Sequence, residues 1–190
     1  MEQASAFNGA ELAGSPAGTL PYVGVRAQTL AATPTGTTDT GVANFTGTVF
    51  SNPSGRGPLF SVTTTAAAGT VIRALPGAQG RYLVRARVNV QTAGTVYAGL
   101  SLGNPTSPIT ANPSLATASI RDVAQSLQAG ADEQSIELTT VWEIDVDAAN
   151  APTPAELRLI LTNGAGAAPA AADLVLAQCM LEVMYLGQAA

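Results

Sequence analysis

The chain has 190 residues, of which 46% are apolar and only 11% are charged, and its formal net charge is −5. It contains no histidine and no lysine, which excludes Ser-His-Asp and Cys-His catalysis, Schiff-base chemistry and the lysine of a phosphate-binding loop. Its acidity opposes nucleic-acid binding, because that binding depends on cations that neutralise phosphates. A surface so poor in charge consists of small neutral side chains, which are easily buried against further copies of the chain.

Residues 1–20 are rich in Gly, Ala and Ser and show no sustained periodicity, so we expect a flexible or extended N-terminal arm. Residues 21–190 are predicted to form one domain, in which short alternating segments are separated by clusters of turn residues. The predicted strands are 22–30, 42–50, 59–65, a strand from 69 to the Pro76-Gly77 turn, 81–90, 93–103, 135–146, 155–163 and 173–186. The pattern indicates an all-β fold, an antiparallel β-sandwich.

The segment 81–90 raises the main functional question, because half of the arginines lie between Arg73 and Arg87. Its alternation places Tyr82 and the other apolar residues toward the core and the arginines on the opposite face, with Arg73 expected nearby. The acidic residues of 135–146 also share one face. Opposite charges on neighbouring strands stabilise a sheet, and across a subunit boundary they fix orientation. The candidate cross-strand or intersubunit ion-pair face consists of Arg81, Arg85, Arg87, Glu137, Glu143 and Asp145.

Other chemical interpretations of these residues have weaker support. The arginine face lacks the interleaved aromatic residues that are typical of single-strand nucleic-acid binding. Glu143, Asp145 and Asp147 alternate and could hold a calcium ion together with loop carbonyls, but a solvated or arginine-paired face is the simpler interpretation. Trp142 and the single cysteine, Cys179, are interpreted as core residues.

Three further segments have local structure that the pattern predicts more or less clearly. The strands 81–90 and 93–103 are expected to pair as a hairpin through the turn 91–94. Residues 119–128 fit either a short helix or a strand with poor alternation, and the pattern does not separate the two. The last segment, 173–186, is largely apolar on both faces, which predicts burial on both sides.

From about Phe45 to Leu186 the order of motifs resembles the tumour-necrosis-factor/C1q-like jelly roll. The motifs are FTGTVFSN, ALPGAQGRYLVRARVNV, AGTVYAGLSLG, LQAGADEQSIELTTVWEI and LVLAQCMLEVMYLG. The resemblance implies a homotrimer whose last strand lines a threefold axis. The candidate trimer-axis residues are Leu174, Leu176, Met180, Met184 and Leu186.

The Ala/Thr/Gly-rich composition is similar to that of bacteriophage virion proteins. Together with the jelly-roll resemblance, it implies a non-enzymatic capsid decoration or cement protein that binds the outside of a phage head as a trimer. No cofactor or metal is expected, and the expected partners are further copies of the chain and the major capsid protein or other virion proteins, not nucleic acid or membrane. The expected location is the capsid surface, after synthesis in the host cytoplasm. The alternative is a tail or head fibre module for receptor recognition, which could bind carbohydrate.

Overall fold

The structure, a computed structural model, describes most of the predicted strands. The described residues are 22–27, 30–34, 41–45, 48–52, 58–65, 69–90, 95–104, 109, 120–127, 134–145, 148–150, 153–163 and 179–187. The predicted N-terminal arm, residues 1–20, lies outside them, as do Leu174, Leu176 and Asp147.

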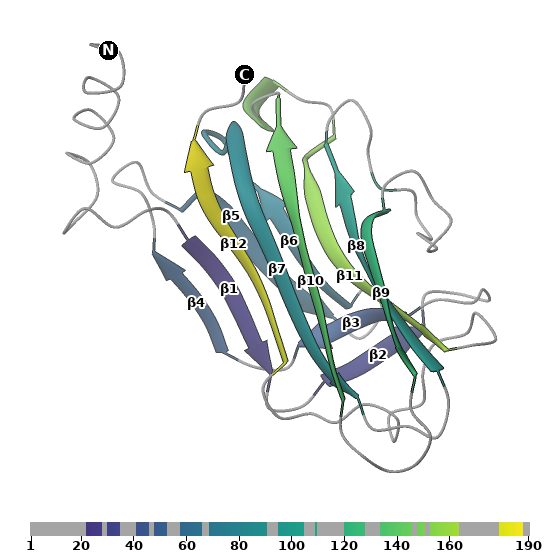
Figure 1. Ribbon diagram of the computed structural model, residues 1–190. Helices are drawn as coiled ribbons and strands as arrows, with labels where there is room; N and C mark the ends of the chain where they lie inside the picture. The colour runs from purple at the N-terminus through teal and green to yellow at the C-terminus, as the bar shows by residue number, and fades with distance from the viewer. Residues whose placement is uncertain are drawn as a thin grey trace.

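Two antiparallel sheets lie face to face, with sheet A in front in Figure 1. Sheet A has the order β10 (Gln134–Ile144), β7 (Gly80–Val90), β12 (Cys179–Gly187), β1 (Tyr22–Ala27) and β4 (Thr48–Asn52). Sheet B has the order β2 (Leu30–Pro34), β3 (Gly41–Phe45), β11 (Glu156–Asn163), β6 (Gly69–Ala74) and β5 (Phe60–Thr65), and β8 (Thr95–Gly103) joins β11 to β9 (Ile120–Leu127). A short 3-10 helix, η2, spans Ala148–Asn150. These elements confirm the all-β prediction.

The hydrophobic core lies between the two sheets and is built by the alternation of each strand. On β7 the residues from Tyr82 to Val88 alternate between buried apolar side chains and outward-facing ones, as the sequence predicted. The same holds for β10, where Trp142 is buried and Glu143 is exposed. Trp142 and Cys179 are both core residues, which confirms their interpretation.

The expected hairpin between residues 81–90 and 93–103 is wrong. β7 belongs to sheet A, where it pairs with β10 and β12, whereas β8 belongs to sheet B, where it pairs with β9 and β11. The chain therefore crosses from one sheet to the other between these strands. Alternation identifies the apolar face of a strand, but it does not identify the sheet that the strand joins.

Residues 120–127, which the pattern left open between helix and strand, form β9. β9 pairs with β8 along the register from Thr95↔Leu127 to Ser101↔Ile120, with an irregularity between Leu100 and Ser101. The secondary structure of this segment is thus determined by backbone pairing with a neighbouring strand, because the spacing of its side chains fits both a helix and a strand.

The predicted Pro76-Gly77 turn connects β6 to β7. The N–H of Ala78 donates a hydrogen bond to the carbonyl of Leu75 at 3.0 Å, and Gly77 has φ 88°. Proline followed by a residue with positive φ is typical of a type II turn, which explains why glycine occupies this position. Tyr82 Oη donates to the carbonyl of Ala78 at 2.8 Å and fixes the turn against the start of β7.

Candidate functional site

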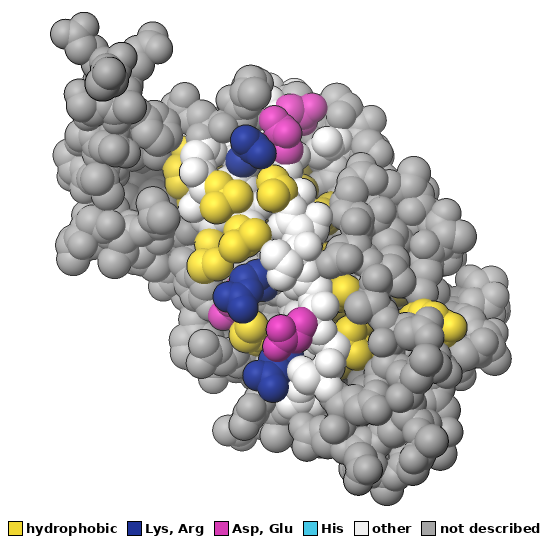
Figure 2. Space-filling view, viewed as in Figure 1, with side chains coloured by type: hydrophobic (Ala, Val, Ile, Leu, Met, Phe, Trp, Pro, Cys, Tyr) yellow, Lys and Arg dark blue, Asp and Glu magenta, His cyan; other side chains and the backbone are white. Residues whose placement is uncertain are grey.

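The outer face of sheet A, the side away from the core, gathers most of the predicted site residues. It is formed by the outward side chains of β10, β7 and β12, which are neighbours in the sheet. Figure 2 looks onto this face and shows hydrophobic side chains between groups of charged ones. The outward residues are Ser135, Glu137, Thr139, Val141 and Glu143 on β10, Arg81, Leu83, Arg85 and Arg87 on β7, and Met180, Glu182, Met184 and Leu186 on β12.

An apolar row crosses the middle of this face. Leu83 on β7 lies opposite Val141 on β10 and opposite Met184 on β12, so the three side chains form one line across three strands. Leu186 lies near the end of β12. Val141 is 43% exposed and Leu186 is 54% exposed, and they are the exposed large hydrophobic residues of the described part of the chain. We call Leu83, Val141, Met184 and Leu186 the apolar row.

One of the predicted cross-strand pairs makes a direct contact. Arg87 lies opposite Glu137 in the register, with Nε and Oε1 3.8 Å apart, and Arg87 Nε also donates to Ser135 Oγ at 2.9 Å. Both charged side chains are substantially exposed, so the pair contributes at most about 1 kcal/mol to stability. Its larger effect is to hold the Arg87 guanidinium toward β10.

Arg81, Arg85 and Glu143 lie on the same face, and the described contacts include no ion pair of these three residues. Arg81 is opposite Glu143 in the register, and Arg85 is opposite Thr139 on β10 and Glu182 on β12. Asp145 follows the end of β10, where its backbone carbonyl accepts a hydrogen bond from Gln79 Nε2 at 2.7 Å. Five of the six predicted residues therefore lie on the outer face of sheet A, and Asp145 is an exposed residue just beyond the end of β10.

The last strand differs in part from its prediction. Its inner face is buried, as expected for Leu181 and Val183, but Leu186 on the outer face is largely exposed in a single chain. Met180 and Met184 are half-buried on that face, whereas Leu174 and Leu176 lie outside the described residues. A two-layer sandwich covers only one face of each sheet, so a second molecule would be needed to cover the other face of β12.

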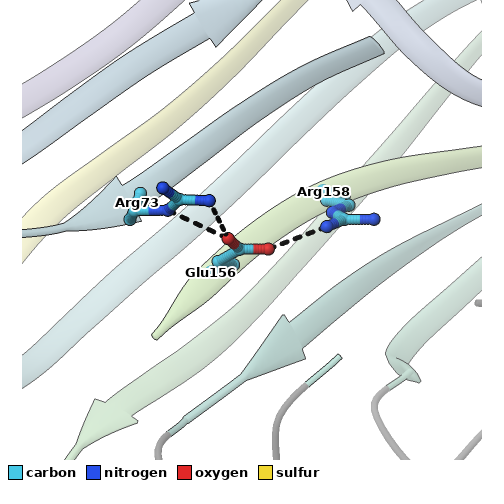
Figure 3. Close-up of polar contacts among 3 residues, drawn as sticks. All are labelled: Arg73, Glu156 and Arg158. Atoms are coloured by element: carbon cyan, nitrogen blue, oxygen red, sulfur yellow. Dashed lines mark hydrogen bonds and ion pairs between the residues drawn. The ribbon is translucent and has the colours of Figure 1, made fainter. Parts of the chain in front are cut away.

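A second charged cluster lies on sheet B and includes Arg73, which was expected near the arginines of β7. Arg73 on β6 contacts Glu156 on β11, with Nη2 2.6 Å and Nε 3.0 Å from Oε1. Arg158 Nη2 lies 2.8 Å from the other carboxylate oxygen, so Glu156 lies between two guanidinium groups, as Figure 3 shows. The expectation for Arg73 was wrong because β6 and β7 belong to different sheets.

The Glu156 carboxylate is kept ionised by its two arginines. Burial alone would raise its pKa, but the hydrogen bonds from Arg158 and Arg73 and their positive charges outweigh this effect, so its pKa lies below the ordinary value of 4.5. The sequence analysis did not predict this cluster. The alternation of Glu156 and Arg158 on one strand was the available signal, but the third member is 83 positions away from Glu156 in the chain.

The described part of the chain contains neither a metal-binding cluster nor a membrane-spanning helix. Its Cys, Asp and Glu side chains nowhere gather in a group of three that could hold a metal ion. The calcium alternative also involved Asp147, which is outside the described residues. Within the same part of the chain, none of the helices has the length and apolarity to cross a membrane.

Comparisons with known proteins give a fold but no family assignment from sequence. No protein-family model and no curated protein matches the chain. Among solved structures, murine APRIL at pH 5.0 is 10% identical, with 88% of this chain and 99% of that chain covered and a TM-score of 0.52. Murine APRIL at pH 8.0 is 12% identical, with 87% and 98% covered and a TM-score of 0.51. The chain has the fold of the tumour-necrosis-factor-like jelly roll, as its motifs predicted.

Proposed function

We propose that the protein is a non-enzymatic structural protein that associates with copies of itself through the outer face of sheet A. The apolar row carries this proposal. Leu83, Val141 and Met184 are adjacent on three strands, and Leu186 follows two positions after Met184 on β12. Val141 and Leu186 are about half exposed in a single chain. Contiguous exposed apolar surface marks an association site, because covering it removes that surface from water.

The proposed assembly is a homotrimer. The jelly-roll fold is common to this chain and murine APRIL, and the resemblance of its motifs implies a threefold arrangement around the last strand. Met184 and Leu186 are the two residues of the apolar row on β12, and they would then lie close to the threefold axis. The low charge of the chain, 11% of residues, also supports burial against copies of itself.

The proposed setting is the outer surface of a bacteriophage head, where the trimer acts as a decoration protein. The neutral Ala-, Thr- and Gly-rich composition supports this setting. The mechanism is multivalent: a trimer that contacts several capsid subunits at once stays attached when any single contact opens, and so it holds neighbouring subunits together. The major capsid protein is the proposed partner. A fibre or receptor-recognition module stays the alternative prediction.

Light scattering coupled to size-exclusion chromatography tests the self-association. The wild-type chain should elute as a trimer at micromolar concentration, and the double variant Val141→Thr/Leu186→Ser should shift toward monomer. Thr63→Ser, at an exposed position of β5 on sheet B, is the matched control and should remain a trimer. A wild-type chain that is a stable monomer contradicts the proposal.

Co-sedimentation tests the setting separately. In a lysate of cells that produce the chain together with its phage, the protein should pellet with assembled heads and be released from them as trimers. A trimer that stays in the supernatant while heads pellet contradicts the capsid role but not the self-association.

A further inference from the structure

The charged residues on the outer face of sheet A differ in whether they are satisfied within one chain. Arg87 contacts Ser135 and Glu137. Glu182 is only 8% exposed and has an interaction of its own within the chain. By contrast, Arg85 and Glu143 are exposed, and neither side chain makes a hydrogen bond or an ion pair among the described contacts.

These two residues lie on opposite sides of the apolar row. Along β7, Leu83 of the row is followed by Arg85 on the same face, and along β10, Val141 of the row is followed by Glu143. Because the strands are antiparallel, these steps lead in opposite directions from the pair Leu83↔Val141. The apolar row therefore lies between Arg85 on one side and Glu143, with Arg81 opposite it in the register, on the other side. Figure 2 shows charged groups on both sides of the hydrophobic patch.

Covering the apolar row would also withdraw water from the charges beside it. A guanidinium that loses its hydration needs a carboxylate in return, because an unpaired buried charge is strongly destabilising. The other carboxylates described on this face are less suitable, since Glu137 already contacts Arg87 and Glu182 is nearly buried. Glu143 is exposed and makes no described ion pair with Arg81, which lies opposite it in the register, so its carboxylate is available to a neighbouring molecule.

A second copy of the chain fits this arrangement, because one surface supplies both the cation and the anion. In a closed ring each copy gives one charge to a neighbour and receives the opposite charge from the other neighbour. We infer that Arg85 of one copy forms an ion pair with Glu143 of the next copy and that this pair fixes the orientation of the subunits. The inference rests on the proposed self-association and specifies the contact that orients it.

Charge reversal tests the pair. Arg85→Glu and Glu143→Arg are each measured by sedimentation equilibrium, together with the double variant that exchanges the two charges. Each single variant should raise the apparent dissociation constant by about tenfold or more, and the double variant should return to within about threefold of wild type. Arg87→Glu, the same charge change one outward position along β7, is the matched control and should have a smaller effect. Circular dichroism melts establish that each variant is folded.

The outcomes separate this inference from the proposed function. A wild-type monomer overturns the proposed self-association and, with it, the pair. A wild-type trimer that is unaffected by Arg85→Glu overturns the pair alone. The pair alone is also overturned if the double variant loses as much association free energy as the two single variants together. An ion pair between the two residues requires the exchanged charges to restore association.

Discussion

Trp142 on β10 donates a hydrogen bond from its indole Nε1 to the carbonyl oxygen of Gly103 on β8, at 3.1 Å, and so links sheet A to sheet B. The contact is buried, and the indole ring packs against Phe60 with ring centroids 5.8 Å apart. The side chain therefore combines a large apolar surface with a directed polar contact between the two layers. Such contacts specify how two sheets stack, because apolar packing alone has little directional preference.

Replacing this residue should test how much the link contributes. Trp142→Phe removes the donor, leaves the Gly103 carbonyl without that partner and creates a small cavity, so the free energy of unfolding should fall by about 3 kcal/mol. Urea unfolding followed by far-UV circular dichroism measures the change, since the variant has no tryptophan to report by fluorescence. Thr63→Ser should stay within about 0.5 kcal/mol of wild type. A loss of less than about 1 kcal/mol for Trp142→Phe would show that the link is energetically minor.

The alternation of two strands was enough to predict part of the candidate site. Residues 81–90 and 135–146 each separate apolar and charged positions cleanly, so their core faces and outward charges could be assigned from sequence. The two strands are neighbours in sheet A, with Arg87 opposite Glu137 and Arg81 opposite Glu143. The periodicity of a strand depends only on local geometry, which is why it can be read without a structure.

The long-range arrangement could not be predicted in the same way. Strands that are close in sequence often pair, so β7 and β8 were expected to form a hairpin and Arg73 was expected beside β7. In this fold the chain changes sheets at these points, and Arg73 instead meets Glu156, which is 83 positions away. The apolar row also depends on two registers at once, because Leu83 aligns with both Val141 and Met184 only in the folded sheet.

The cluster around Glu156 should make stability depend on pH. The pKa of Glu156 is lowered in the folded protein, so its ionised form stabilises the fold above its ordinary pKa of 4.5, and this contribution is lost as the pH falls through the folded value. Glu156→Gln should therefore be less stable than wild type at neutral pH, because two guanidinium groups lose their shared anion. The difference should shrink as the pH is lowered below about 4.5.

Glu137→Gln provides the comparison for this prediction. Glu137 is mostly exposed and its contact with Arg87 is long, so its removal should change stability by less than about 1 kcal/mol at any pH. Urea midpoints measured from pH 3 to pH 7, a range of roughly four units around the ordinary carboxyl pKa, test both variants. If the difference in urea midpoint between wild type and Glu156→Gln stays constant over this range, the charge of the carboxylate does not contribute to stability.

Cys179 should be protected from thiol reagents in the folded protein. Its side chain is fully buried at the start of β12, and its sulfur accepts a hydrogen bond from the N–H of Asn89 at 3.4 Å. A disulfide reagent such as 5,5′-dithiobis-(2-nitrobenzoic acid) should therefore react slowly with native protein and rapidly in denaturing urea, because reaction requires exposure of the thiol. Rapid reaction with the native protein would show that β12 opens readily at this end.

Gly80 and Gly187 offer a matched test of close packing at the start of β7. Gly80 has φ 154° and Gly187 has φ 155°, so an alanine at either position would have the same unfavourable φ. A Cβ at Gly80 would lie 2.8 Å from Tyr185 Cε2 and 3.0 Å from the Gly187 carbonyl oxygen, whereas a Cβ at Gly187 would have no atom within 4 Å. Gly80→Ala should therefore lose about 3 kcal/mol of unfolding free energy and Gly187→Ala about 1 kcal/mol, as measured by urea unfolding followed by Trp142 fluorescence. Equal losses would mean that backbone conformation alone selects glycine at residue 80, and that the Tyr185 ring moves aside without cost.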